Sequence, residues 1–191
     1  MTLEANYTST DAAGNERNVP SMDLALGLDA SGNPEALRSG FGQIGAASAT
    51  PTVSATPDYA SGDAVGGIMT FAGVTRGDGG TAYITAALIT CKAANTAQMD
   101  LFLFSASPSS STVTDNAAFA LHADDASNLI GVIPVSSWYS GGTPSVGFND
   151  ACRVPVQGQA ADDIYGVLVA RGAVNLASTS DISVFLTPDK N

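Results

Sequence analysis

The sequence predicts an all-β protein: a jelly-roll-like β-sandwich preceded by an extended N-terminal arm with short hairpins. From about residue 59 onward, short runs of β-branched and aromatic residues recur, each bounded by Gly, Pro, Asn, Asp or Ser. Few helical patterns lie between these runs, which favours a sandwich or a jelly roll. The earliest part of the chain has only scattered apolar positions. We therefore expect an arm and linker over 1–56 and a jelly-roll β-sandwich body over 57–191.

The arm contains a small internal repeat, "DAAGN" at 11–15 and "DASGN" at 29–33. Both are typical of hairpin turns, because Asp opens a turn through side-chain hydrogen bonds and Gly accepts the positive φ that closes it. The stretch "LALGL" at 24–28 is expected to pair as a short strand. A hairpin of this size buries little by itself and needs a partner surface. Residues 40–58 have the Gly, Ala, Ser, Thr and Pro composition of a linker.

Strands of the body are predicted at 67–74, 81–92, 98–105, 128–138, 163–172 and 181–187. In the second of these runs, Ile84, Ala86 and Leu88 are expected to share one face, because alternate residues of a strand point the same way. Pro134 places the far end of its run at a sheet edge or a bend, since proline cannot donate to a ladder.

Three other runs alternate in the same way. The residues expected to share a face are Met99, Leu101 and Leu103; Phe102 and Phe104; Tyr165, Val167 and Val169; Ile164 and Leu168; and Ile182, Val184 and Leu186. Several runs are therefore apolar on both faces, which is expected if another layer or subunit covers the second face.

One segment departs from the β pattern, "TDNAAFALHADDASNLI" at 114–130. Asp115 is a candidate N-cap for a helical turn over 117–121, and Asp124 and Asp125 precede a second short turn. We expect a long excursion between strands that contains one or two helical turns.

The composition excludes several classes of partner. Charged residues make up 13% of the 191 residues, and the formal net charge is −11, with lysine only at Lys92 and Lys190. Binding to nucleic acid depends on cations that neutralise phosphates, so this chain is expected to repel it, and anionic membranes too. The first ten residues lack the basic and apolar regions of a signal peptide. No run approaches the roughly 18 apolar residues of a membrane span.

The stretch "YASGDAVGGIMTF" at 59–71 has the glycines of a phosphate loop but not its lysine or its following helix. Gly62, Gly66 and Gly67 are therefore interpreted as backbone hinges, and Asp63 as a carboxylate that caps a turn. The stretch is predicted to mark the boundary between arm and body.

No metal or cofactor is predicted. Two distant cysteines, Cys91 and Cys152, and one histidine cannot build a zinc site; we expect two free buried thiols, with a disulfide as the alternative. The calcium-loop spacing D-x-[DN]-x-[DN]-G is absent. Loops bringing together the carboxylates at 63, 115, 150, 162 and 163 remain an alternative that the sequence leaves open.

The sequence predicts no catalytic residue and no enzyme. The sequence contains no G-x-S-x-G nucleophile elbow with which His122, the single histidine, could pair. His122 is therefore expected at the surface or an interface. Paired carboxylates of a glycoside hydrolase stay an open alternative. Trp138 and Tyr139, followed by "SGG", form either a loop-tip anchor or, for the tryptophan, a buried subunit contact.

A resemblance adds to these expectations. The ordered set "YASGDAVGGIMTFAGVTRGDGGTAYITAALIT", "MDLFLF", "TDNAAFAL", "NLIGVIPV" and "YGVLVARGAVNLASTSDISVFLT", with "GLDASGN" in the arm, resembles capsid decoration (cement) proteins of tailed bacteriophages. The likeness covers about residues 59–187; the linker departs from the group in being rich in Thr and Pro.

The resemblance implies a virion structural protein with a jelly-roll body on the outer capsid surface. It would bind the major capsid protein, stabilise the shell and form a homotrimer. The alternative is a receptor- or glycan-binding jelly-roll module of a phage fibre or baseplate.

Overall fold

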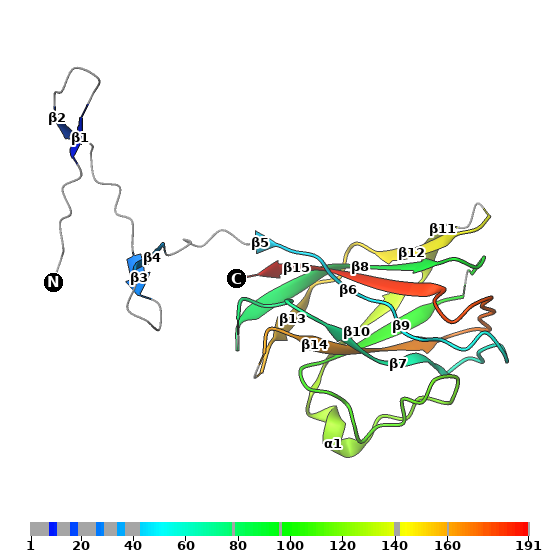
Figure 1. Ribbon diagram of the computed structural model, residues 1–191. Helices are drawn as coiled ribbons and strands as arrows, with labels where there is room; N and C mark the ends of the chain where they lie inside the picture. Colours follow the sequence, from blue (N-terminus) through cyan, green and yellow to red (C-terminus); the bar gives the residue numbers. More distant parts are fainter. Residues whose placement is uncertain are drawn as a thin grey trace. The chain divides into compact units, whose positions relative to one another are not determined.

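A computed structural model describes residues 8–10, 16–18, 26–28, 34–36, 43–77, 79–95, 97–139, 142–159 and 161–190 (Figure 1). The chain divides into two compact units, Met1–Phe41 and Gly42–Asn191. The division therefore comes earlier than the boundary near residue 56 that the composition predicts.

The first unit contains two antiparallel hairpins. Strand β1 (Thr8–Thr10) pairs with β2 (Glu16–Asn18), and β3 (Leu26–Leu28) pairs with β4 (Pro34–Ala36). This antiparallel pairing agrees with the two predicted hairpins; the turn residues expected at 11–15 and 29–33 lie outside the described residues. Each hairpin forms a sheet of two strands, with Leu26 opposite Ala36 in the second.

The second unit is built from two antiparallel sheets. The four-stranded sheet has the order β10 (Leu129–Val135), β9 (Met99–Phe104), β14 (Ile164–Ala170) and β7 (Ala64–Phe71). The seven-stranded sheet has the order β11 (Ser137–Tyr139), β12 (Ser145–Asn149), β8 (Thr81–Cys91), β15 (Ile182–Lys190) and β5 (Gln43–Ile44), while β13 (Val154–Gln157) pairs with β8 and β6 (Ala47–Ala49) with β15. The predicted all-β sandwich is confirmed; the strand order by itself does not establish a jelly roll.

The main core lies between the two sheets. The alternation predicted from the sequence is confirmed for β9, β14 and β15, whose inward residues are buried: Met99, Leu101, Leu103, Ile164, Leu168, Ile182, Val184 and Leu186. Pro134 lies in β10, which is an edge strand, as proline requires. Burial of these apolar side chains is the main force that holds the sheets together.

A second, smaller core covers the other face of the four-stranded sheet. Phe104, Val167 and Val169 are buried there, and Val113 and Phe119 pack against them. The covering residues belong to the long excursion after β9, which lies below that sheet in Figure 1. The chain itself therefore supplies the second layer that the two-faced apolar pattern requires.

Strand β8 differs from its predicted alternation. Ala82 and Ile84 are buried as expected, but the buried residues then become Ala87, Ile89 and Cys91. The ladder with β15 shifts at this point, because Thr187 lies opposite Ala86 and the next residue, Pro188, lies opposite Ile84. The extra residue in β8 is a β-bulge, which exchanges the two faces of the strand. Ile84 therefore does not share a face with Leu88.

Residues 43–53, interpreted from composition as a linker, belong to the sandwich. β5 and β6 pair with β15, while Ala47 and Val53 are buried. The composition misleads because small polar residues suit an edge strand as well as a linker, and the edge of β15 supplies backbone partners. Tyr59, at the predicted boundary, is 1% exposed and lies in the core.

The excursion contains one short helix among the described residues, α1 (Ala123–Ala126). The predicted turn over 117–121 does not form; Ala118 and Ala120 instead make isolated bridges with Asp63 and Thr112. The N-cap of α1 is His122, whose Nδ1 accepts a hydrogen bond from the backbone N–H of Asp124 at 3.2 Å. In the described part of the chain, no helix has the length and apolar character needed to cross a membrane.

Candidate functional site

An apolar strip lies on the outer face of the seven-stranded sheet. The register places Phe148 of β12 opposite Leu88 of β8, and Leu88 opposite Phe185 of β15. Phe148 and Phe185 are 41% and 40% exposed, and Leu88 is partly exposed. Side chains directly opposite on neighbouring strands are in contact range. We call these three residues the outer strip.

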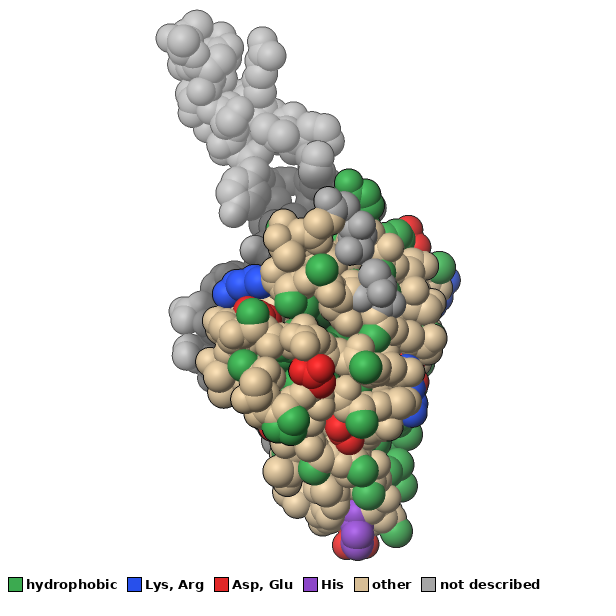
Figure 2. All heavy atoms as spheres, turned by 90° about the vertical axis from the view of Figure 1, so that its right-hand side faces the viewer, with side chains coloured by type: hydrophobic (Ala, Val, Ile, Leu, Met, Phe, Trp, Pro, Cys, Tyr) green, Lys and Arg blue, Asp and Glu red, His purple; other side chains and the backbone are tan. Residues whose placement is uncertain are grey.

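The row beside the outer strip is uncharged too. Tyr139, which is 70% exposed, lies opposite Val146, and that residue lies opposite Thr90. Figure 2 shows the end of the molecule at the right of Figure 1, where hydrophobic side chains are spread over a surface with few charged ones. Neighbouring rows of apolar and uncharged side chains on an exposed sheet face are suited to contact with another protein.

Of the two alternatives given for Trp138, the loop-tip anchor is not formed. It lies in β11 with Tyr139, but its side chain is on the opposite face and packs against the core. A Cβ atom added at Gly147 would lie 2.7 Å from the indole, so glycine makes room for the ring. The indole is thus an internal packing residue, and Tyr139 carries the outward aromatic surface.

Asp115 connects three separate segments rather than capping a helix. Its carboxylate accepts hydrogen bonds from the hydroxyls of Ser54 at 2.5 Å and Tyr59 at 2.6 Å, and from the N–H of Gly66 at 2.6 Å. Burial, together with this carboxylate, raises the pKa of the Tyr59 hydroxyl far above its usual value. The predicted N-cap role is wrong because no helix forms directly after Asp115, and its carboxylate instead bonds to partners that are distant in the sequence.

Other carboxylates hold loops together. Asp125, 4% exposed, accepts from the N–H groups of Ser110 and Ser111 and from the Ser111 hydroxyl. Asp63 accepts from the N–H of Ala60 at 2.7 Å, which confirms its predicted role in a turn. Carboxylates used in this way stabilise loop conformation and are committed to internal hydrogen bonds.

Asp181 does the same for the loop before β15, accepting from the N–H groups of Ala177 and Ser178 and from the Ser178 hydroxyl. Desolvation opposes its ionisation, but these hydrogen bonds and the charge of Lys92 outweigh it and lower the pKa of Asp181.

The remaining candidate residues do not form a reactive centre. Cys91 is buried and Cys152 partly buried, both are free, and desolvation raises the pKa of each thiol. His122 is about half exposed, in agreement with the surface position predicted for it, and lies 3.3 Å from Asp124. Among the described residues, no group of three or more His, Cys, Asp or Glu side chains is arranged to hold a metal ion.

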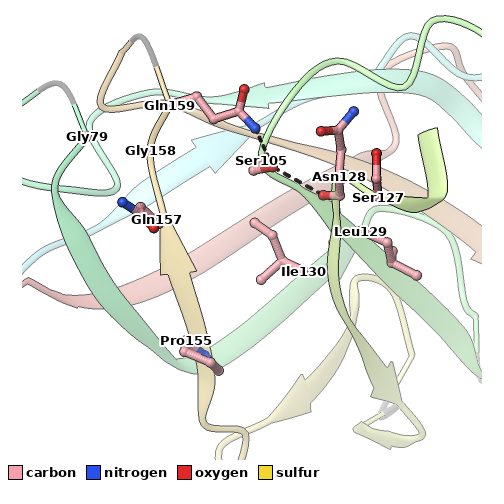
Figure 3. A pocket seen from close by; sticks show the side chains of 10 residues that line it. All are labelled: Gly79, Ser105, Ser127, Asn128, Leu129, Ile130, Pro155, Gln157, Gly158 and Gln159. Carbon is pink, nitrogen blue, oxygen red and sulfur yellow. Dashed lines mark hydrogen bonds between the residues drawn. The ribbon is translucent and has the colours of Figure 1, made fainter. Parts of the chain in front are cut away.

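A pocket of about 460 Å³ opens between β10 of one sheet and β13 of the other. Its lining combines amide and hydroxyl side chains with a few apolar ones: Gly79, Ser105, Ser127, Asn128, Leu129, Ile130, Pro155, Gln157, Gly158 and Gln159 (Figure 3). Gln159 Nε2 donates to Ser105 Oγ at 3.0 Å across one rim. The sequence gives no sign of this pocket, because its residues come from separate segments and carry no local motif.

Comparisons with known proteins add no assignment. No family model matches the chain, and neither curated proteins nor solved structures contain a match.

Proposed function

We propose that the chain is a structural protein of a bacteriophage virion, a decoration protein that binds the outer surface of the major capsid protein shell and stabilises it. The observation that carries the proposal is the outer strip, Phe148, Leu88 and Phe185. Phe148 and Phe185 lie on one sheet face and are each about two-fifths exposed, so contact of their rings with water has an unfavourable free energy. Covering the exposed part of each contributes on the order of 1 kcal/mol.

The charge distribution supports self-association across this face. A chain with a formal net charge of −11 repels its own copies, so close approach is favoured only where the contacting surfaces lack charge. The rows of the outer strip and of Tyr139 meet that condition. A closed ring of copies, such as a homotrimer, would cover the strip of every subunit.

The arm supports a second contact, with the capsid. Its two hairpins, β1–β2 and β3–β4, are sheets of two strands, which are marginally stable alone. Such hairpins become stable when a partner surface covers them. In this proposal the arm contacts the major capsid protein, and the jelly-roll-type body stands on the outer capsid surface.

The proposal is tested by cosedimentation with expanded capsids of the bacteriophage whose genome encodes this chain. We expect the full chain to sediment with capsids, and a chain lacking 1–41 to stay folded but remain in the supernatant. Phe148→Ser/Phe185→Ser should shift the mass measured by light scattering toward the monomer. The matched control is Leu121→Ser/Val132→Ser, which removes two similarly exposed apolar residues elsewhere, at 37% and 38% exposure.

The outcomes separate the parts of the proposal. Normal capsid binding by the truncated chain would refute the role of the arm. An unchanged mass for the outer-strip variant would refute self-association through this face. Absence of capsid binding by the full chain would refute the decoration function itself.

A further inference from the structure

We propose that the pocket between β10 and β13 binds an uncharged saccharide. This site lies apart from the outer strip, and its function does not depend on the decoration function proposed above. It is also separate from Trp138 and Tyr139, where the sequence suggested an aromatic anchor.

The lining residues that the structure describes are polar or apolar, and none of them is charged. Asn128, Gln157 and Gln159 contribute primary amides, and Ser105 and Ser127 contribute hydroxyls. An anionic or cationic ligand would find no opposite charge on these lining side chains. A neutral ligand rich in hydroxyl groups matches them, because amides and hydroxyls both donate and accept hydrogen bonds.

Two of the amides are available to a ligand. The side chains of Asn128 and Gln157 have no hydrogen-bond partner within the described part of the chain, whereas Gln159 donates to Ser105. A primary amide places its acceptor oxygen beside its donor nitrogen, so it can pair with two neighbouring sugar hydroxyls at once. The bond between Gln159 and Ser105 holds one rim in place.

Apolar residues complement the polar ones. Figure 3 shows the side chain of Ile130 between the strand that carries Pro155 and the strand that begins at Leu129. Such a surface suits the C–H face of a sugar ring. The pocket volume lies within the range of about 300–1,000 Å³ for small-molecule sites. None of the described lining residues is aromatic, so affinity should be low, with a Kd on the order of 1 mM.

An extended peptide is the less favoured ligand. β10 and β13 each pair with another strand along one edge, so a peptide would have to add to their free edges. Pro134 in β10 and Pro155 in β13 each remove a backbone donor, and proline at an edge opposes strand addition. A compact ligand that depends on side-chain amides avoids this restriction.

Nuclear magnetic resonance of the full chain tests the inference, with maltose, lactose and N,N′-diacetylchitobiose as probes up to about 20 mM. We expect at least one of them to give saturable shifts of the backbone amides at Ser105, Asn128 and Gln157. Asn128→Ala/Gln157→Ala should weaken binding about tenfold, because it removes several hydrogen bonds. The matched control Gln98→Ala/Asn175→Ala removes two exposed amides outside the pocket and should leave Kd unchanged within about twofold.

Each outcome decides the question. Saturable shifts lost in the pocket variant and retained in the control support the site. Absence of shifts with all of these sugars, or shifts that both double variants affect equally, would overturn it. A blocked dipeptide that shifts the same amides when the sugars do not would assign the pocket to peptides. Capsid binding is measured separately, so the two proposals fail independently.

Discussion

Replacing Asp115 with alanine should destabilise the body, because its carboxylate links segments of the chain that lie far apart in the sequence. The carboxylate joins Ser54, Tyr59 and Gly66 through three hydrogen bonds. Hydrogen bonds to a charged group contribute about 1.5–3 kcal/mol each, and partial exposure reduces this value. Their loss also leaves the hydroxyl of Tyr59, a residue 1% exposed, without an acceptor.

We expect Asp115→Ala to lower the free energy of unfolding by about 3–5 kcal/mol. Asp115→Asn should cost about half as much, because it retains one acceptor oxygen but turns an amide donor toward other donors. Tyr59→Phe should cost about 1–2 kcal/mol, since it removes one of the three bonds.

Urea unfolding followed by circular dichroism measures these changes, with the slope m as a check that the same surface is exposed. Asp150→Ala is the control, because Asp150 is an exposed loop carboxylate and should change stability by less than about 0.5 kcal/mol. A loss below about 1 kcal/mol for Asp115→Ala, or one equal to that of the control, would refute the role of this carboxylate as a link between segments.

Three further predictions concern glycines and acid stability. Gly66→Ala should lower the free energy of unfolding by about 3 kcal/mol or more, because the residue has φ +81° and its Cβ would lie 2.3 Å from a proline side chain. Gly62→Ala is the control: Gly62 has φ +99° and open space around it, so this variant measures the backbone cost alone, about 1 kcal/mol. Equal losses for the two variants in urea unfolding would refute the steric part of the prediction. The pKa of Asp181 is lowered in the folded state, so its ionised form stabilises the fold at pH values above its pKa in the unfolded chain, near 3.8, and this stability is lost as the pH falls through the folded-state pKa. Asp181→Asn should therefore flatten the pH dependence of the urea midpoint below about pH 4. An unchanged pH dependence would contradict this role of Asp181. Gly147→Ala should displace the indole of Trp138 and shift its fluorescence maximum, whereas an unchanged spectrum with unchanged stability would show that the ring has room for a methyl group.

Within single strands, the sequence alone allowed good predictions of which residues face inward. Leu101, Leu168 and Val184 lie in the core as their alternation predicts, because burial of one face of a strand is visible in neighbouring residues. The prediction was wrong in β8, where the extra residue at Thr85 exchanges the faces. A bulge depends on the length of the partner strand, which the local pattern does not contain.

The composition did not predict correctly where the arm ends and the body begins. Gly, Ala, Ser and Thr around Ala47 are typical of linkers, yet these residues pair with β15 and Val53 enters the core. Whether such a segment becomes a linker or an edge strand depends on whether a sheet edge lies beside it. Asp115 also shows that a local pattern does not reveal distant partners. Its residue type and position suit a helix cap, yet its carboxylate accepts hydrogen bonds from Gly66 and Ser54, which lie 49 and 61 positions away in the sequence.

By itself, then, the sequence determined the all-β class, the inward residues of most strands, the reversals of the arm and the absence of a lysine-bearing phosphate loop. These are local properties, expressed by residues close together in the chain. The tertiary structure alone decided the apolar row of Phe148, Leu88 and Phe185, the pocket between β10 and β13, and the partners of Asp115. Each requires segments far apart in sequence to meet, and strand register and sheet order determine which ones do.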